Sequence, residues 1–257
     1  MRPPPYTGMT GFKSRSQVDA VHTALGGQCL LMVGVGVCGS PLQEKHSGCP
    51  DRYPNASELG TIFPSYSNVL NLLHLHDHDH SKLLEHILVA QDLAGPNCHG
   101  IQLNQCQISQ SLPDVDLLAK YKATGRTGRT IVLPCDRSAL DMVGWNPVKL
   151  ARRLKVYESL VEYIIMDFSG GKGEELDTSL AHECFREIAQ LMPNVGFVVS
   201  GGLCADNVAA KISPLREFDP GTDAEGKIHT NGRFDVAKAI RYGLATIEAK
   251  RVQQPVN

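Results

Sequence analysis

The sequence lacks the features of several specialised classes of protein. Among its 257 residues, no apolar run approaches the roughly 20 that a membrane-spanning helix needs. Its 25 Lys and Arg residues are matched by 27 Asp and Glu, so no excess of positive charge favours nucleic acid. A hydrophobic content of 42% with 20% charged residues is enough to bury a core and excludes a disordered chain. We therefore expect a compact soluble protein without a membrane or nucleic-acid partner.

Signals for secretion, for cysteine-bound metal and for a dinucleotide are also missing. The segment Met1–Pro5 has three prolines and no apolar signal core. The eight cysteines are scattered without a Cys-x-x-Cys pair, which disfavours structural zinc. Reduced thiols are expected in such a chain, which predicts a cytoplasmic protein. No cofactor is expected, because Gly34–Gly36 leads to Pro41 and a polar loop rather than to the helix of a dinucleotide site.

Short apolar runs alternate with helical patterns along most of the chain. The runs predicted as strands are Cys29–Val37, Asn68–Leu75, Gly100–Leu103, Thr130–Leu133, Tyr163–Met166 and Val195–Val199, with a weaker one before Thr7 and a last one near Glu217–Asp219. Helices are predicted at Gln17–Leu25, Ser81–Ala94, Val115–Thr124, Pro147–Tyr157, Thr178–Leu191 and Ala205–Lys211, and the stretch Arg233–Lys250 follows. Continuously apolar strands are typical of a parallel sheet covered by helices. The pattern predicts an α/β protein, a single-domain (β/α)8 barrel over residues 1–257, with an open doubly wound sheet as the main alternative.

The longest irregular stretch, Gly39–Ser65, is rich in Pro, Gly, Ser and Asn. In a barrel it would be an extended loop after the second strand. Long loops are uncommon in compact domains unless they are functional.

A carboxylate and a glycine-rich turn follow one of the apolar strands. The strand leads to Asp167, and glycines follow at Gly170, Gly171 and Gly173. A carboxylate at the C-terminal end of a barrel strand points to the mouth, where barrel enzymes work. The glycines allow the backbone to approach a ligand and expose amides to an anion. The alternative is a plain turn in which Asp167 caps the next helix.

A second glycine pair lies between a predicted strand and a predicted helix. Ser200, Gly201 and Gly202 follow the strand, and Asn207 is a residue type that begins helices. Backbone amides at a helix N-terminus bind phosphate, and the loops after strands seven and eight form such a site in many barrels. The alternative is a tight turn that needs glycine for a positive φ.

Taken in order, these segments resemble phosphoribosylanthranilate isomerase of tryptophan biosynthesis. Ser200–Leu203 with Asn207 and Val208 matches the family's Ser-Gly-Gly-Leu-x-Pro-x-Asn-Val. Asp167 with the glycines after it and Asp177 resembles the family's Asp, Gly-Gly-x-Gly and second Asp. The resemblance implies a (β/α)8 barrel that binds a phosphoribosyl compound and isomerises it.

Two further segments extend the resemblance over nearly the whole chain. Gly100–Asn104 looks like the family's Gln-Leu-His segment, with Asn104 in place of the His. Arg52 and Tyr53 resemble a segment after the second strand that contacts the substrate carboxylate. The ligand-binding residues implied are Gly170, Gly171, Gly173, Ser200, Gly201, Gly202, Arg52, Gln102 and Asn104.

The resemblance also implies an Amadori rearrangement, in which an acid opens the ribose ring and a base takes the proton from C2. It gives the acid role to Asp167, whose pKa burial would raise. The family's base is the Cys of Cys-Gly-x-Thr, and Thr7-Gly8-Met9-Thr10 puts Thr7 there. A threonine hydroxyl cannot replace a thiolate as a base. The candidates for a substitute are Cys38, His74, His76 and Asp136.

The eighth strand departs from the family. Its Asp-Val-Ser-Ser-Gly-Val-Glu, whose amides complete the phosphate site, is replaced by Phe218–Gly226. Pro220 is expected to remove an amide donor there, and Asp223 to add a negative charge near the anion. Half of the phosphate cradle is therefore expected to be retained.

A histidine-rich segment, His74–His80, lies at the end of the predicted third strand. Alternation along a strand would put His74, His76, His78 and His80 on one face. Histidines and carboxylates suit zinc, iron or nickel, so His74 and His76 are weak candidates for metal ligands. We favour a solvated turn without metal, because metal sites usually gather ligands from separate elements.

Several functions are compatible with these residues. The leading interpretation is an acid–base isomerase of a phosphorylated, phosphoribosyl-like small molecule, related to phosphoribosylanthranilate isomerase. A different isomerase, a lyase or a hydrolase of a phosphorylated or nucleotide-like ligand is the first alternative, since fold alone does not separate these. A non-catalytic barrel that binds such a ligand and has lost its base is the second. Metal-dependent hydrolysis through the histidine segment is the third.

Overall fold

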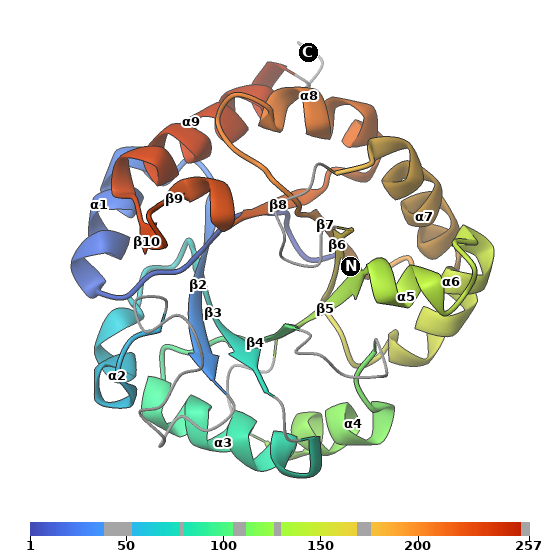
Figure 1. Cartoon of the computed structure of the whole chain (residues 1–257), viewed down its shortest axis with the longest axis horizontal. Helices are drawn as coiled ribbons and strands as arrows, with labels where there is room; N and C mark the ends of the chain where they lie inside the picture. The colour runs from blue at the N-terminus through green and yellow to red at the C-terminus, as the bar shows by residue number, and fades with distance from the viewer. Residues whose placement is uncertain (39–52, 78–79, 105–111, 126–129, 169–175, 253–257) are drawn as a thin grey trace.

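The computed structural model describes residues 1–38, 53–77, 80–104, 112–125, 130–168 and 176–252. Eight parallel strands form a closed barrel in which each pairs with its neighbours in sequence and β8 pairs with β1. They are β1 Tyr6–Thr10, β2 Leu30–Cys38, β3 Val69–His76, β4 Gly100–Asn104, β5 Thr130–Asp136, β6 Tyr163–Asp167, β7 Gly196–Val199 and β8 Gly221–Ala224. Figure 1 looks along this barrel, with the helices as a ring around it. The predicted (β/α)8 barrel is confirmed, and the open sheet is wrong.

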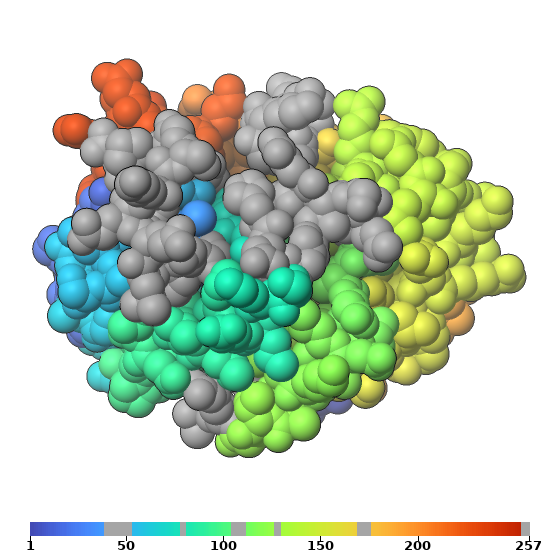
Figure 2. All heavy atoms as spheres, turned by 60° about the horizontal axis from the view of Figure 1, so that its bottom comes forward, coloured from blue at the N-terminus to red at the C-terminus, as the bar shows by residue number. Residues whose placement is uncertain are grey.

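Helices cover the outer face of the barrel, and Figure 2 shows one side of this ring with α3 in teal and α4 in green. They are α1 Arg15–Leu25, α2 Leu59–Ile62, α3 Leu83–Ala94, α4 Val115–Ala123, α5 Arg137–Asp141, α6 Pro147–Leu154, α7 Thr178–Leu191, α8 Val208–Ile212 and α9 Val236–Val252. Ser14 and Gln17 form a capping box at α1, and Asp114, Asn146 and Asp177 accept backbone N–H groups at α4, α6 and α7. Over the described ranges, no helix is both long and apolar enough to span a bilayer.

The apolar core has two layers. One lies between the strands and the helices. The other fills the barrel interior with Tyr6, Met32, Leu72, Val132, Tyr163, Ile165 and Val198. Because side chains alternate along a strand, the inner layer shows which residues point inward. On β1, Tyr6, Gly8 and Thr10 face the interior, whereas Thr7 and Met9 face the helices.

The predicted last strand is wrong. Glu217 belongs to a 3-10 helix, Ser213–Phe218, and Asp219 has a left-handed backbone with φ 44°. Pro214 lies in the first turn of this helix, and the left-handed residue Asp219 separates the helix from β8. The strand itself has only four residues and no apolar run, so periodicity does not reveal it.

Two connections contain more structure than predicted. Between β8 and α9, β9 His229–Thr230 and β10 Arg233–Phe234 form an antiparallel hairpin. After β2, residues 39–52 lie outside the described part. The rest of that predicted loop includes a 3-10 helix, Ala56–Glu58, and α2, which buries Leu59 and Ile62.

Candidate active site

Four polar side chains fill the barrel interior beside the inner apolar layer. They are Thr10 on β1, His74 on β3, Gln102 on β4 and Asp223 on β8, and none is more than 5% exposed. We call these four residues the polar layer. Buried polar groups are costly unless they are paired, so their gathering at one level of the barrel needs a reason beyond packing.

Thr10 connects the polar layer. Its Oγ1 lies 3.2 Å from Asp223 Oδ1. It also lies 3.3 Å from Nδ1 and 3.4 Å from Nε2 of His74. The side chain of Gln102 hydrogen-bonds the Asp223 carboxylate as well. One hydroxyl thus joins two titratable groups that come from strands on either side of β1.

One glycine makes this meeting possible. Gly34 of β2 is in register with Thr10. A Cβ on Gly34 would lie 2.5 Å from Thr10 Oγ1 and 2.8 Å from His74 Nε2. Because this strand position carries no side chain, Thr10 and His74 can reach one another across β2.

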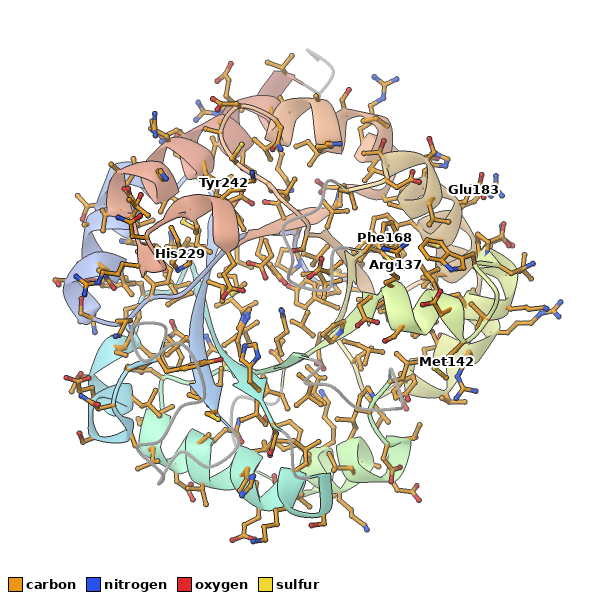
Figure 3. All side chains as sticks on the ribbon, in the orientation of Figure 1. Arg137, Met142, Phe168, Glu183, His229 and Tyr242 are labelled. Carbon is orange, nitrogen blue, oxygen red and sulfur yellow. The ribbon has the colours of Figure 1, made fainter. Side chains whose placement is uncertain are left out.

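The inward direction of Asp223 is set by its neighbour on β8. Thr222 points outward, where the Tyr242 hydroxyl of α9 donates a hydrogen bond to Thr222 Oγ1 at 2.7 Å. Figure 3 labels Tyr242 on the helix side of the barrel. Because successive strand residues point to opposite faces, Asp223 must point into the barrel.

Burial raises the pKa of Asp223 to about 8. The neighbouring carboxylates of Glu225 and Asp167 contribute to this rise, whereas hydrogen bonds from Thr10 and Gln102 oppose it. The Asp223 carboxyl therefore holds its proton at neutral pH, which is the state that a general acid requires.

Asp167 is the last residue of β6 and is half-buried. Its carboxylate is close enough to Asp223 to raise that residue's pKa. In register beside it, Asp136 caps α5, accepting hydrogen bonds from Ala139 N at 3.1 Å and Ser138 Oγ at 2.7 Å. The helix after β6 is instead capped by Asp177, so capping does not account for Asp167.

Thr7 does not line the interior. It is buried between the barrel and the helices, where its hydroxyl hydrogen-bonds the thiol of Cys29. Thr7 and Thr10 are an odd number of positions apart, so a strand turns them to opposite faces. The residue that β1 presents to the polar layer is Thr10, and the family position predicted for the base faces the helices.

The glycine pair after β7 forms the predicted turn. Gly201 has φ 109° and Gly202 has φ 62°, both in the region that favours glycine. Asn207 ties the turn together, because its Oδ1 accepts from Cys204 N at 2.9 Å and its Nδ2 donates to Gly202 O at 2.9 Å. Ser200 is half-buried at the start of this turn.

The predicted effects of the eighth strand on this turn are wrong. Pro220 precedes β8, so it lies at the end of the barrel opposite the loops that follow the strands. Asp223 lies within β8 and points into the interior, rather than standing in a loop beside an anion.

Part of the predicted site cannot be placed. Gly170, Gly171, Gly173 and Arg52 lie outside the described residues, as does the side chain of Asn104. Of the residues implied by the Gln-Leu-His segment, Gln102 is in the polar layer, beside His74 in the register of β3 and β4.

The histidine segment divides between two faces. His74 belongs to the polar layer, and His76 is half-buried with its ring 5.7 Å from that of Tyr53. Asp77 is buried against His86 of α3, with Asp77 Oδ2 2.6 Å from His86 Nδ1. Residues 78 and 79 lie outside the described part. Within the described ranges, no three His, Cys, Asp or Glu side chains are placed to hold a metal ion.

Sequence reasoning missed the roles of Thr10 and Asp223. The available signal was an acid flanked by Thr222 and Ala224 in a short run after Gly221, which has the alternation of a strand but no apolar stretch. Without the correct eighth strand, nothing indicated that Asp223 would lie inside.

Comparisons with known proteins agree with the fold. No protein-family model and no curated protein sequence matches the chain. Among solved structures, N-(5'-phosphoribosyl)anthranilate isomerase from Pyrococcus furiosus is similar, with a TM-score of 0.61 and 16% identity over 95% of this chain and 99% of that chain.

Two other solved structures are similar over comparable lengths. A phosphoribosyl anthranilate isomerase in complex with reduced 1-(o-carboxyphenylamino)-1-deoxyribulose 5-phosphate has a TM-score of 0.59 and 15% identity over 96% of this chain and 99% of that chain. Triosephosphate isomerase from Bartonella henselae has a TM-score of 0.60 and 12% identity over 97% and 100%. At these identities the likeness establishes that this chain has the (β/α)8 fold of these proteins.

Proposed function

We propose that this protein is an isomerase of a phosphorylated sugar derivative, similar in activity to phosphoribosylanthranilate isomerase. The carrying observation is the buried Asp223 carboxyl, protonated at neutral pH, joined to His74 through Thr10 inside the barrel. An acid and a base at one level of the barrel suit a reaction that protonates one substrate atom and deprotonates another.

The acid side of the site consists of Asp223 and Asp167. In an Amadori rearrangement the acid protonates the ribose ring oxygen, and the group that does so must carry a proton near neutral pH. Asp167 is the residue that the family resemblance assigns to this step. Its neighbour Asp223 adds a carboxyl with a pKa of about 8 beside it. Two close carboxyls favour a state in which one of them holds the proton.

The base side is His74. Thr7 faces the helices, and Asp136 is engaged as the cap of α5. His74 lies within hydrogen-bond reach of Thr10 and, through it, of the acid side. A neutral imidazole has one ring nitrogen with a free lone pair, which can take a proton from a substrate. It is therefore the substitute for the family's cysteine that the polar layer supports.

The substrate class rests on the structural neighbours and on the glycine turn. Neighbours named for phosphoribosylanthranilate and triosephosphate share the fold over 95% and 97% of this chain. The Ser200–Gly202 turn follows β7, where many barrels bind phosphate through backbone amides. Together they support a phosphorylated sugar derivative as the ligand.

The test is loss of phosphoribosylanthranilate fluorescence on addition of the protein, with glyceraldehyde 3-phosphate as a second probe. We expect turnover of the first, and a loss of about 10²–10⁴-fold in kcat for Asp167→Asn, because removing a general acid costs that much. Asp136→Asn is the matched control, since asparagine also caps helices and this residue is not placed in the chemistry. Absence of turnover of both probes by folded protein, or equal activity of the two variants, would reject the proposal.

A further inference from the structure

The Thr10 hydroxyl can satisfy its two partners in either of two directions. A hydroxyl donates one hydrogen bond and accepts others. When Asp223 is ionised, Thr10 donates to Asp223 Oδ1, and a His74 N–H donates to Thr10 Oγ1. When Asp223 carries the proton, it donates to Thr10, and Thr10 donates to a His74 nitrogen. Thr10 Oγ1 lies within hydrogen-bond reach of both residues, at 3.2 Å from Asp223 Oδ1, 3.3 Å from His74 Nδ1 and 3.4 Å from His74 Nε2.

The three groups are also buried. Thr10 is 2% exposed, His74 is 1% exposed and Asp223 is 4% exposed. Proton transfer needs a continuous path of donors and acceptors, and Thr10 Oγ1 supplies one between the two titratable groups.

We propose that Thr10 relays a proton between His74 and Asp223, so that the acid and base of this site are reset inside the barrel. The role of the relay in catalysis rests on the proposed isomerase function. The coupling between the protonation of Asp223 and that of His74 is a property of the protein without substrate. Thr10 is in this view a positioning residue that acts through its two partners.

The relay step conserves every proton. After the substrate has taken a proton from the acid pair of Asp167 and Asp223 and given one to His74, Asp223 is left as an anion and His74 is a cation. The His74 N–H bond breaks as a new O–H bond forms on Thr10. The original Thr10 O–H bond breaks as a new O–H bond forms on Asp223. His74 and Asp223 both become neutral, and neither water nor a co-reactant is consumed.

Other ionisable groups lie around Asp223 and have to be distinguished from it. Glu225 directly follows β8, and Asp167 interacts with it from β6. The phenols of Tyr6 on β1 and of Tyr242 on α9, on the outer side of the strand, also interact with it electrostatically, and burial raises the pKa of each phenol well above its ordinary value. Neither phenol therefore ionises near pH 8, where Asp223 does.

The relay can be measured without any substrate, by NMR of the ¹³C/¹⁵N-labelled histidine rings between pH 5 and 10. The sequence has ten histidines, so a spectrum of His74→Gln assigns the His74 signals. We expect the His74 ring nitrogen that faces Thr10 to change between hydrogen-bond donor and acceptor in a step near pH 8. Asp223→Asn should remove this step, because it removes the group that titrates.

Two substitutions of Thr10 isolate the hydroxyl. Thr10→Val keeps the shape and lacks the oxygen, whereas Thr10→Ser keeps the oxygen. We expect the donor–acceptor change to be lost in Thr10→Val and retained in Thr10→Ser, with circular dichroism confirming that both are folded. The relay would be overturned if Thr10→Val kept the donor–acceptor change of His74, or if the wild-type protein did not show it. If Thr10→Val does not fold, loss of the donor–acceptor change in folded Thr10→Ser would overturn the relay.

Kinetics then separates the relay from the proposed function. If phosphoribosylanthranilate is turned over, Thr10→Val should lower kcat about tenfold or more without changing KM, and Thr10→Ser should restore it. Coupling in the NMR experiment with no turnover of either probe would reject the isomerase and retain the relay. Turnover without coupling would reject the relay alone.

Discussion

Burial of Asp223 gives this carboxyl the protonated state that a general acid needs, and it also lowers the stability of the protein as the pH rises. Its pKa of about 8 means that folding favours its protonated form. An unfolded aspartate has a pKa near 3.9, so the folded protein binds this proton more tightly than the unfolded chain. The resulting stability is fully present below about pH 4 and is lost as the pH rises to about 8.

Asp223→Asn is therefore expected to flatten the dependence of stability on pH. Between pH 4 and 8 the wild-type free energy of unfolding should fall as the pH rises, because only the unfolded chain releases this proton in that range. The variant cannot titrate there, so it should gain on the wild type as the pH rises. Urea unfolding of both proteins at pH 5, 7 and 9 measures this difference. Parallel pH profiles would show that the carboxyl is not buried as described.

Gly34 tests whether the polar layer depends on an empty position. A Cβ there would lie 2.5 Å from Thr10 Oγ1 and 2.8 Å from His74 Nε2, so Gly34→Ala must push these groups apart. We expect a loss of about 1–3 kcal/mol in stability, as overpacking usually gives. We also expect the donor–acceptor change of the His74 ring near pH 8 to disappear from the NMR titration.

Gly226→Ala is the control for Gly34→Ala, because a Cβ at Gly226 meets nothing within 4 Å. Its stability should stay within about 0.5 kcal/mol of wild type. If Gly34→Ala behaved like this control, the contact between Thr10 and His74 would not depend on the glycine.

At the scale of elements, the turn between β7 and α8 is held by one side chain. Asn207 makes hydrogen bonds at both ends of its amide, to Cys204 N and Gly202 O. Asn207→Ala should free the glycine turn and weaken binding of inorganic phosphate, measured by calorimetry, by about tenfold. Such a loss corresponds to about 1.4 kcal/mol, in the range of one or two hydrogen bonds.

Asn146→Ala provides the matched control for this element. Asn146 also accepts a backbone N–H, from Lys149, but at the start of α6. Its removal should lower stability by about 0.5–2 kcal/mol, as for other helix caps, and leave phosphate binding unchanged. Equal phosphate affinity in both variants would separate the turn from any anion site.

The elements also show what local sequence predicts well. The limits predicted for α7, Thr178–Leu191, are those observed, because the Asp177 cap and the apolar period define a helix without help from the rest of the chain. The last strand fails for the opposite reason. β8 is a strand because β7 and β1 pair with its two edges, and its own sequence does not predict that pairing.

At the scale of the whole molecule, the two ends of the barrel have separate tasks. The polar layer lies toward the C-terminal ends of the strands, whereas the segment before β1 packs at their N-terminal ends. There the Arg2 guanidinium lies 4.7 Å from the centroid of the Phe197 ring, and the Tyr163 hydroxyl donates to Pro4 O at 2.8 Å. Stability and chemistry should therefore be separable by mutation.

Arg2→Ala tests this separation. Loss of the contact with Phe197 should lower Tm by about 2–4 °C, which corresponds to about 1 kcal/mol in a protein of this size. The His74 step near pH 8 should be unchanged, because the polar layer is not touched. Arg241→Ala, at an exposed arginine of α9, is the control and should leave both quantities at their wild-type values. A changed His74 step in Arg2→Ala would show that the two ends are coupled.

The sequence by itself determined the succession of strands and helices, since apolar runs, caps and glycine turns act over a few residues. It also drew attention to Asp167, His74 and the Ser200–Gly202 turn, because each stands at the end of a recognisable strand. Only the tertiary structure decided that Thr10 meets His74, 64 positions away, and Asp223, 213 positions away. Closure of the barrel sets the register that brings β1, β3 and β8 together, and Gly34 at that register leaves room for the side chains of Thr10 and His74. Burial inside the closed barrel then raises the pKa of Asp223, a property that no local pattern contains.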